Sequence, residues 1–317
     1  MNNFPNGVLA FAWALPILVI SLFIFPYFTA GDQEFYRSFY NGVSELSFAE
    51  GFVFYKDSLG TSEPGYFLLS FLLSPFVPKD ILFSVLNFIL FQQLFLWLLR
   101  NDVSRVLFPM LYLNFYLLVL AFSAERLKLS LLFFLIGCCA SSLLRYLFLA
   151  ASVISHVQVL ILIASTQVRR LNAVLGALFQ GRVGYGFLSL AFLTMLMLAI
   201  LFVLRDHIAS KLGAYYGVWG GPEAVLKPLL VTLLSVFYAQ ERKLEALLAS
   251  LPLALCAYLI GEERIVIFSY FIFMFYALQV NRGLNVGVAI TSLYFSYKGI
   301  LFLSNVIFLG DGFARAS

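Results

Sequence analysis

The sequence predicts an all-α polytopic membrane protein, and its composition is the main reason for this prediction. Of its 317 residues, 62% are hydrophobic, 18% are aromatic and only 11% are charged. A soluble globular protein carries about 25% charged residues, so these charges are too few to cover a surface that faces water. The mean hydropathy of +0.96 leads to the same conclusion. The composition excludes a soluble enzyme, a nucleic-acid-binding protein and a disordered chain, and it requires a lipid bilayer as the main solvent.

Long apolar runs divide the chain into about ten expected transmembrane helices, because a bilayer core needs about 20 apolar residues per helix. The runs that meet or approach this length are 7–29, 81–99, 106–122, 127–144, 146–165, 185–204, 228–240, 246–261, 265–281 and 284–308. Two shorter runs, 66–77 and 171–180, predict re-entrant or interfacial helices. We therefore expect residues 1–317 to form a single transmembrane domain.

The linkers between these runs predict the orientation of the chain. Short linkers are basic, and two long polar segments cover residues 30–65 and 205–227. Placing the basic turns in the cytoplasm puts both long segments on the outer side. This orientation leaves nine Lys and Arg residues inside and eleven outside, so only the charge density of the short loops favours it. A single span at 146–165 would also put the basic pair 169–170 outside, unless the helix breaks near His156.

The first candidate site residues lie in the long polar segment near the N-terminus. Asp32, Tyr36 and Tyr40 are spaced at i, i+4 and i+8, so one helical face can present all three. Asp32 also directly follows a span, where it fits the role of a helix N-cap equally well.

A second candidate is the motif Glu63-Pro64-Gly65-Tyr66, which opens the short run 66–77. Proline at the first helical position and an acid beside a helix N-terminus are ordinary helix-start chemistry. The glutamate also lies where the chain re-enters the membrane, so a ligand-binding or catalytic role is an equal alternative.

Single cations and a histidine provide the remaining candidates. Arg126 opens a span, where it either snorkels to the interface or binds a phosphate through its planar fork. His156 lies inside an apolar run, as an interior residue or as a functional group. Arg205 precedes a segment rich in Tyr and Trp, which is typical of an interfacial belt or of a sugar-binding surface. Arg264 follows two acids that either neutralise it or leave it to face a pyrophosphate.

The order of these residues resembles the EpsG-like branch of the Wzy-type O-antigen and capsule polysaccharide polymerases. The residues that carry the resemblance are Gly31, Asp32, Tyr36, Tyr40, the motif at 63–66, Arg126, His156 and Arg264. The resemblance is best between residues 31 and 165. Around its arginine the family often has Asn or Gly with Gln, whereas this chain has Glu125.

The resemblance implies a GT-C-like membrane glycosyltransferase in the bacterial inner membrane. Such an enzyme joins oligosaccharide repeat units carried on undecaprenyl pyrophosphate at the periplasmic face. Because its donor is already activated, it needs no metal, nucleotide or other cofactor. The implied partners are the lipid-linked donor and acceptor, the lipid bilayer and a chain-length regulator, without nucleic acid. The absence of P-loop, GxGxxG, CxxC and HExxH motifs agrees with this.

The resemblance also suggests a role for each candidate residue. The expected pyrophosphate-binding residues are Arg126, Arg264 and Arg205. The expected general base is Glu63 or Asp32, with His156 in reserve. The tyrosines expected to line the sugar path are Tyr36, Tyr40 and Tyr66.

Two other classes of membrane protein compete with the polymerase. A secondary transporter or flippase for a lipid-linked or anionic substrate also places arginines and acids in a membrane protein. The sequence shows no internal repeat, and its charges lie at span ends except for His156, which favours the polymerase. A noncatalytic scaffold would not need paired arginines and carboxylates on one face.

Overall fold

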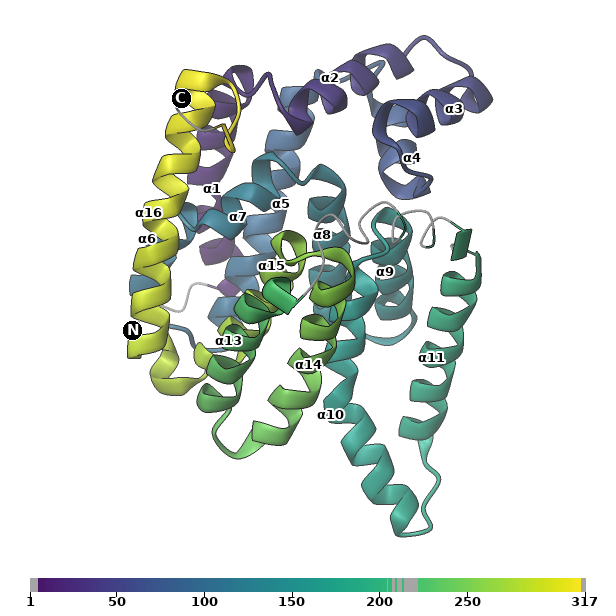
Figure 1. The fold of residues 1–317 in the computed structure, drawn as a ribbon, viewed down its shortest axis with the longest axis vertical. Coiled ribbons are helices and arrows are strands. Elements are labelled where there is room, and N and C mark those ends of the chain that lie inside the picture. The colour runs from purple at the N-terminus through teal and green to yellow at the C-terminus, as the bar shows by residue number, and fades with distance from the viewer. Residues whose placement is uncertain (1–4, 204, 207–208, 210–212, 214–221, 315–317) are drawn as a thin grey trace. The chain divides into compact units, whose positions relative to one another are not determined.

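The computed structural model describes residues 5–203, 205–206, 209, 213 and 222–314, and every regular element within these residues is a helix (Figure 1). The chain divides into two compact units, which are described separately. The first contains Met1–Val159 and Arg282–Ser317, and the second contains Leu160–Asn281. The all-helical part of the prediction is therefore confirmed for the described residues.

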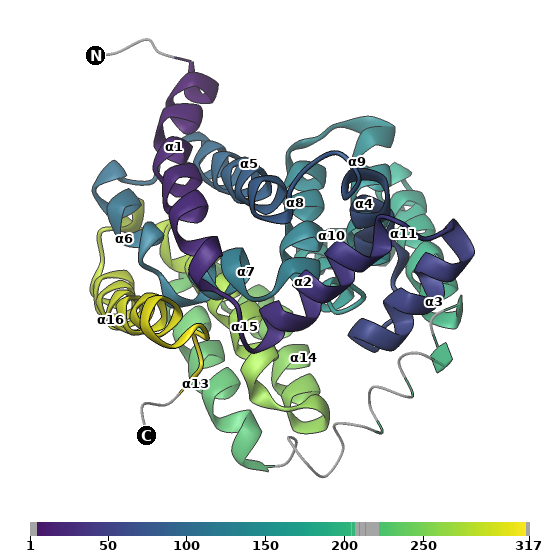
Figure 2. The ribbon, with the colours of Figure 1, turned by 90° about the horizontal axis from the view of Figure 1, so that it is seen from above.

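The first unit is a bundle of helices in which α5 lies between α1 and α8 (Figure 2). Next to α8 packs α9, and α16 covers α6 and α7. Its helices are α1 (Asn6–Ile24), η1 (Phe25–Tyr27), α2 (Asp32–Val43), α3 (Phe48–Leu59), α4 (Pro64–Leu73), α5 (Lys79–Arg100), η2 (Arg105–Leu107), α6 (Phe108–Tyr112), α7 (Phe115–Phe122), α8 (Glu125–Cys139), α9 (Ser142–Ser155) and α16 (Val286–Leu309).

The expected outer segment at 30–65 is not an open loop but the two helices α2 and α3, which pack on each other and on α4. Ser47 and Glu50 form a capping box that starts α3, and Gly60 ends it at a φ of 57°. The buried side of α2 carries Gln33, Tyr36 and Tyr40 among others. Local capping and an amphipathic face therefore explain this pair of helices.

Three helices in the described part of the chain are long and apolar enough to cross a bilayer: Asn6–Tyr27, Lys79–Arg100 and Val280–Leu309. A fourth span arises if Arg105–Tyr112 and Phe115–Phe122, which meet at a bend of 53°, cross together. The chain thus has the helices of a membrane protein. The expected number of ten spans stays a prediction.

The expected span at 146–165 contains a break. Helix α9 ends at Ser155, His156 is extended with φ −162° and ψ 115°, and the next helix begins at Val159. A break near His156 is the condition under which the basic pair 169–170 could lie inside, and the orientation itself stays a prediction. The break also leaves the backbone N–H of Val157 available for a side chain.

The second unit consists mainly of α13, α14 and α15, which pack on one another. The prediction of a separate short helix at 171–180 is wrong. Helix α10 (Val159–Phe179) includes most of these residues without interruption, and the chain turns only at Gly181, where φ is 69°. Most of the expected outer segment 205–227 lies outside the described residues. The helices are α10 (Val159–Phe179), α11 (Tyr185–Val203), α13 (Pro222–Tyr238), η3 (Gln240–Arg242), α14 (Lys243–Ile260), α15 (Glu262–Ala277) and η4 (Val280–Gly283).

The end of α16 is tied to the start of α2. The carbonyl of Gly310 accepts the backbone N–H groups of Thr29 and Ala30 at 3.1 and 2.9 Å. Gly31 follows at a φ of 62°, and a Cβ there would lie 2.9 Å from the carboxylate carbon of Asp311. Gly31 therefore meets both a conformational and a steric requirement.

Another glycine allows α16 to approach the turn after α6, and it gives a test of the packing. A Cβ on Gly299 would overlap the carbonyl oxygen of Leu113 and lie 2.8 Å from its carbonyl carbon. We expect Gly299→Ala to lower the free energy of unfolding in detergent by about 2 kcal/mol, because backbone cannot move aside as a flexible side chain can. Gly7→Ala is the matched control, since a Cβ there meets nothing within 4 Å. Equal loss in both variants would contradict this packing.

Candidate functional site

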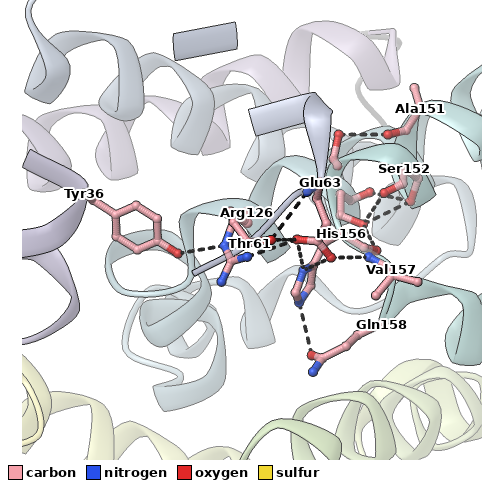
Figure 3. A network of polar contacts seen from close by, with 11 residues as sticks. Tyr36, Thr61, Glu63, Arg126, Ala151, Ser152, His156, Val157 and Gln158 are labelled. Carbon is pink, nitrogen blue, oxygen red and sulfur yellow. Dashed lines mark hydrogen bonds and ion pairs between the residues drawn. The ribbon is translucent and has the colours of Figure 1, made fainter. Parts of the chain in front are cut away.

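The candidate site is built around the carboxylate of Glu63, which is 1% exposed (Figure 3). The Nδ1 atom of His156 lies 3.0 Å from each of its oxygens. Arg126 donates from Nη1 to Oε2 at 3.1 Å, and the backbone N–H of Val157 donates to Oε1 at 2.8 Å. The hydroxyl of Thr61 also donates to Oε2 at 3.3 Å. A single buried carboxylate thus contacts Arg126, His156, a hydroxyl group and one backbone donor.

The motif at 63–66 supplies this geometry. Glu63 is the N-cap residue of α4, and Pro64 takes the first helical position. A Cβ on Gly65 would lie 2.7 Å from the Cα of Ser155, at the end of α9. Glycine therefore allows α4 to touch the backbone of α9, and this contact brings the adjacent His156 to the carboxylate.

The register between α8 and α9 is fixed by two buried serines. Ser130 donates to the carbonyl of Ser152 at 2.7 Å, and Ser152 donates to the carbonyl of Ser130 at 2.8 Å. These reciprocal bonds set the height of Arg126 on α8 relative to His156 at the end of α9. They satisfy groups that would otherwise be buried without partners.

The side chain of Arg126 is held from two sides and remains 14% exposed. Besides its ion pair with Glu63, it donates from Nε to the hydroxyl of Tyr36 at 3.4 Å. The ring of Tyr36 packs against that of Tyr66, with centroids 5.4 Å apart. Arg126 is therefore a preorganised cation in a largely buried position.

Glu63 is a poor proton acceptor in this arrangement. Burial alone would raise its pKa, but His156, Arg126 and the N–H of Val157 outweigh that effect and hold the pKa at about 2. The carboxylate is therefore ionised at neutral pH, and its contacts orient the two cationic side chains.

A second buried carboxylate, Glu125, lies next to Arg126 in the chain and is 0% exposed. It accepts hydrogen bonds from Lys79 at 2.6 Å, from Gln33 at 2.8 Å and from the hydroxyl of Tyr66 at 2.7 Å. Lys79 also donates to the amide oxygen of Gln33 at 2.6 Å. This network joins α2, α4, α5 and α8 beside the Glu63 site.

A third basic side chain, Lys128, is buried beside these two networks. Lys128 donates to the carbonyl of Ala121 at 2.8 Å, and its Nζ lies 4.8 Å from the ring centroid of Phe83. Burial lowers the pKa of Lys128 to about 7, so its side chain does not carry a full positive charge at neutral pH. The charges of Arg126 and Lys79 then match those of Glu63 and Glu125.

Five of the expected site residues meet in these two networks: Glu63, Arg126, His156, Tyr36 and Tyr66. Asp32 is exposed on the first turn of α2, close enough for its charge to act on the Tyr36 hydroxyl. Tyr40 bonds elsewhere, to the carbonyl of Val77 at 2.7 Å.

The two other expected arginines belong to the second unit. Arg205 is 63% exposed and lies 3.6 Å from Asp206. The side chain of Arg264 lies outside the described residues. The geometry around Glu63 therefore tests neither the role expected of Arg205 nor the role expected of Arg264.

Sequence reasoning missed Glu125, Lys79, Lys128 and Gln33. Glu125 and Lys128 lie on either side of Arg126 in the sequence, so their charges could have marked them as candidates. Lys79 could have been marked by its position at the start of a span. The only indication for Gln33 was that it lies in the same polar segment as Tyr36. Within the described part of the chain, no group of three His, Cys, Asp or Glu side chains is arranged to hold a metal ion.

Comparisons with known proteins do not assign this site. No protein-family model matches the chain, and no curated protein or solved structure is significantly similar to it. The geometry of the site is therefore the basis for assigning a function.

Removal of the central carboxylate tests whether the site is one electrostatic unit. We expect Glu63→Ala to lower the free energy of unfolding in detergent by about 3 kcal/mol, because it leaves Arg126 and His156 without their common counter-charge. Glu34→Ala, at an exposed position of α2, is the control and should change stability by less than about 0.5 kcal/mol. A Glu63→Ala protein as stable as the control would mean that the ion pairs contribute nothing.

The low pKa of Glu63 predicts a dependence of stability on pH. Because the folded-state pKa is about 2 and the ordinary value is 4.5, the stabilisation is complete above pH 4.5 and is lost as pH falls from there towards 2. It amounts to about 3 kcal/mol. Denaturant titrations of wild type and Glu63→Gln should differ by this amount at pH 6, and the difference should shrink below pH 4.5. A constant difference down to pH 3 would disprove the assignment.

Proposed function

We propose that this protein is a metal-independent membrane glycosyltransferase that polymerises oligosaccharide units carried on polyprenyl pyrophosphate, at the periplasmic face of the bacterial inner membrane. The observation that carries the proposal is Arg126, whose guanidinium is fixed by Glu63 and Tyr36 and whose side chain is 14% exposed. A pyrophosphate is the anion that the proposed donor would bring to it.

Arg126 would stabilise the leaving group. As the bond between the anomeric carbon and the pyrophosphate oxygen breaks, negative charge grows on the pyrophosphate. A guanidinium that is already oriented can bind that charge through its fork without reorganisation. The ion pair with Glu63 keeps the guanidinium in place before the donor arrives.

His156 is the better of the proposed proton acceptors. The Nδ1–H of a neutral His156 donates to Glu63, which leaves Nε2 to take the proton of the acceptor hydroxyl. That nitrogen lies 3.1 Å from the amide oxygen of Gln158. In the proposed mechanism the amide therefore presents its NH2 group to the neutral ring and its oxygen to the protonated ring. The acceptor oxygen then bonds to the anomeric carbon, and the pyrophosphate leaves as an anion.

This assignment changes the role expected of Glu63 from base to positioning residue. Its carboxylate already accepts from four partners and stays ionised, so it orients His156 and Arg126 and stabilises the imidazolium. Asp32, at an exposed position of α2, remains the alternative general base. Of the three expected tyrosines, Tyr36 is the one that lies nearest to the proposed reaction.

A transporter or flippase for a lipid-linked anion is the second candidate, and one observation favours it. The helix break at 156–158 lies beside a buried carboxylate and an arginine, and broken helices beside charged groups are common at transporter substrate sites. The two functions differ in whether a covalent bond forms.

Arg126→Ala tests the polymerase directly. Purified protein in detergent is supplied with lipid-linked repeat units, and products are separated by gel electrophoresis. We expect wild type to form a ladder and Arg126→Ala to reduce its rate by at least 100-fold, because the leaving group loses its main counter-charge. Arg105→Ala, at an exposed position of the first unit, should retain the ladder.

The same assay separates the two candidates. Detergent offers no compartments, so transport alone cannot yield longer chains. If wild type forms no ladder in detergent but moves lipid-linked units across sealed vesicles, the polymerase proposal is wrong and the transporter is correct.

A further inference from the structure

The first unit contains a second polar site, a cavity of about 320 Å³ between α2 and the turn that joins α4 to α5. This volume is at the lower end of the range of about 300–1,000 Å³ found for small-molecule pockets. Seven of its nine lining residues have hydrogen-bonding side chains, and only Val77 and Pro78 are apolar. Six of these polar residues are Arg37, Tyr40, Asn41, Ser44, Ser74 and Asp80.

Two side chains in the wall of this cavity are held in place by hydrogen bonds to backbone carbonyls. Arg37 donates to the backbone carbonyls of Phe28 and Phe25, so its guanidinium cannot swing freely. Tyr40 is fixed by its hydrogen bond to the carbonyl of Val77. A ligand would therefore pay little for ordering these side chains.

The charges of the cavity are compensated internally. Arg37 lies 2.9 Å from Asp80, and Lys79 turns to the buried Glu125. A pyrophosphate would therefore find no unpaired cation among these three side chains. Paired charges with hydroxyl and amide groups instead suit a neutral molecule with many hydroxyl groups.

The hydrogen-bonding groups that a ligand can reach lie on α2. Asn41 is exposed and Ser44 is half-buried, whereas Ser74 Oγ and Asp80 Oδ1 are buried within the wall. The amide of Asn41 and the hydroxyl of Ser44 can each bond to a hydroxyl group of a ligand.

We infer that this cavity binds a neutral saccharide, with hydroxyl groups on Asn41 and Ser44 and the ring's apolar face on Val77 and Pro78. Lys79 lines the cavity and also binds Glu125, the residue before Arg126. Lys79 therefore connects the two sites. Given the proposed function, on which this last step depends, the saccharide is the terminal sugar of the acceptor.

Direct binding to the full chain tests this inference. The protein is purified in a detergent without a sugar headgroup, and saturation-transfer NMR is recorded with the methyl glycosides of glucose, galactose, mannose, rhamnose and N-acetylglucosamine. We expect at least one glycoside to bind wild type, and to bind the double variant Asn41→Ala/Ser44→Ala at least tenfold more weakly. The control Ser38→Ala, exposed on the same helix and outside the cavity, should bind like wild type.

The outcomes are distinct. If none of the five glycosides binds, or if the double variant binds as well as wild type, the inference is overturned. It is also overturned if Arg126→Ala weakens glycoside binding as much as the double variant does, because the sugar then belongs to the other site. If glycosides bind as expected but wild type forms no ladder, the proposed polymerase fails while the saccharide site stands.

Discussion

The ion pairs of Glu63 with Arg126 and His156 join segments that are far apart in the sequence. Through them the N-terminus of α4, the first turn of α8 and the break after α9 meet at one point. A buried carboxylate is costly without counter-charges, and buried cations are equally costly without it. Each of these segments therefore depends on the others for its place, and the position of Arg126 depends on all of them.

Much of this arrangement follows from local signals. Pro64 at a helix start, the apolar runs and the Asp-Tyr spacing of α2 predicted where helices begin and which groups deserve attention. The basic residues after 165 indicated that a break near His156 was one of two alternatives for this run. Such features depend on neighbours in the sequence, which is why the pattern of residues reveals them.

The pairing of charges could not be predicted in the same way. Glu125 was a neighbour of Arg126 in the sequence, yet its partners are Lys79 and Gln33, which lie 46 and 92 residues from it. Spacing along one helix says nothing about which distant cation will meet a carboxylate. Glu63 likewise looked like a base until its partners showed that its charge is already in use. Helix position follows from periodicity, whereas the role of an ionisable group follows from tertiary contacts.

Gly65 limits which amino-acid substitutions this protein can accept. It carries no functional group, but the backbone of Ser155 occupies the space that any side chain would need. A survey of substitutions scored by function would thus mark Gly65 as strictly as Arg126, although one position is restricted by volume and the other by charge. Intolerance to change at this motif is therefore not by itself a sign of chemistry.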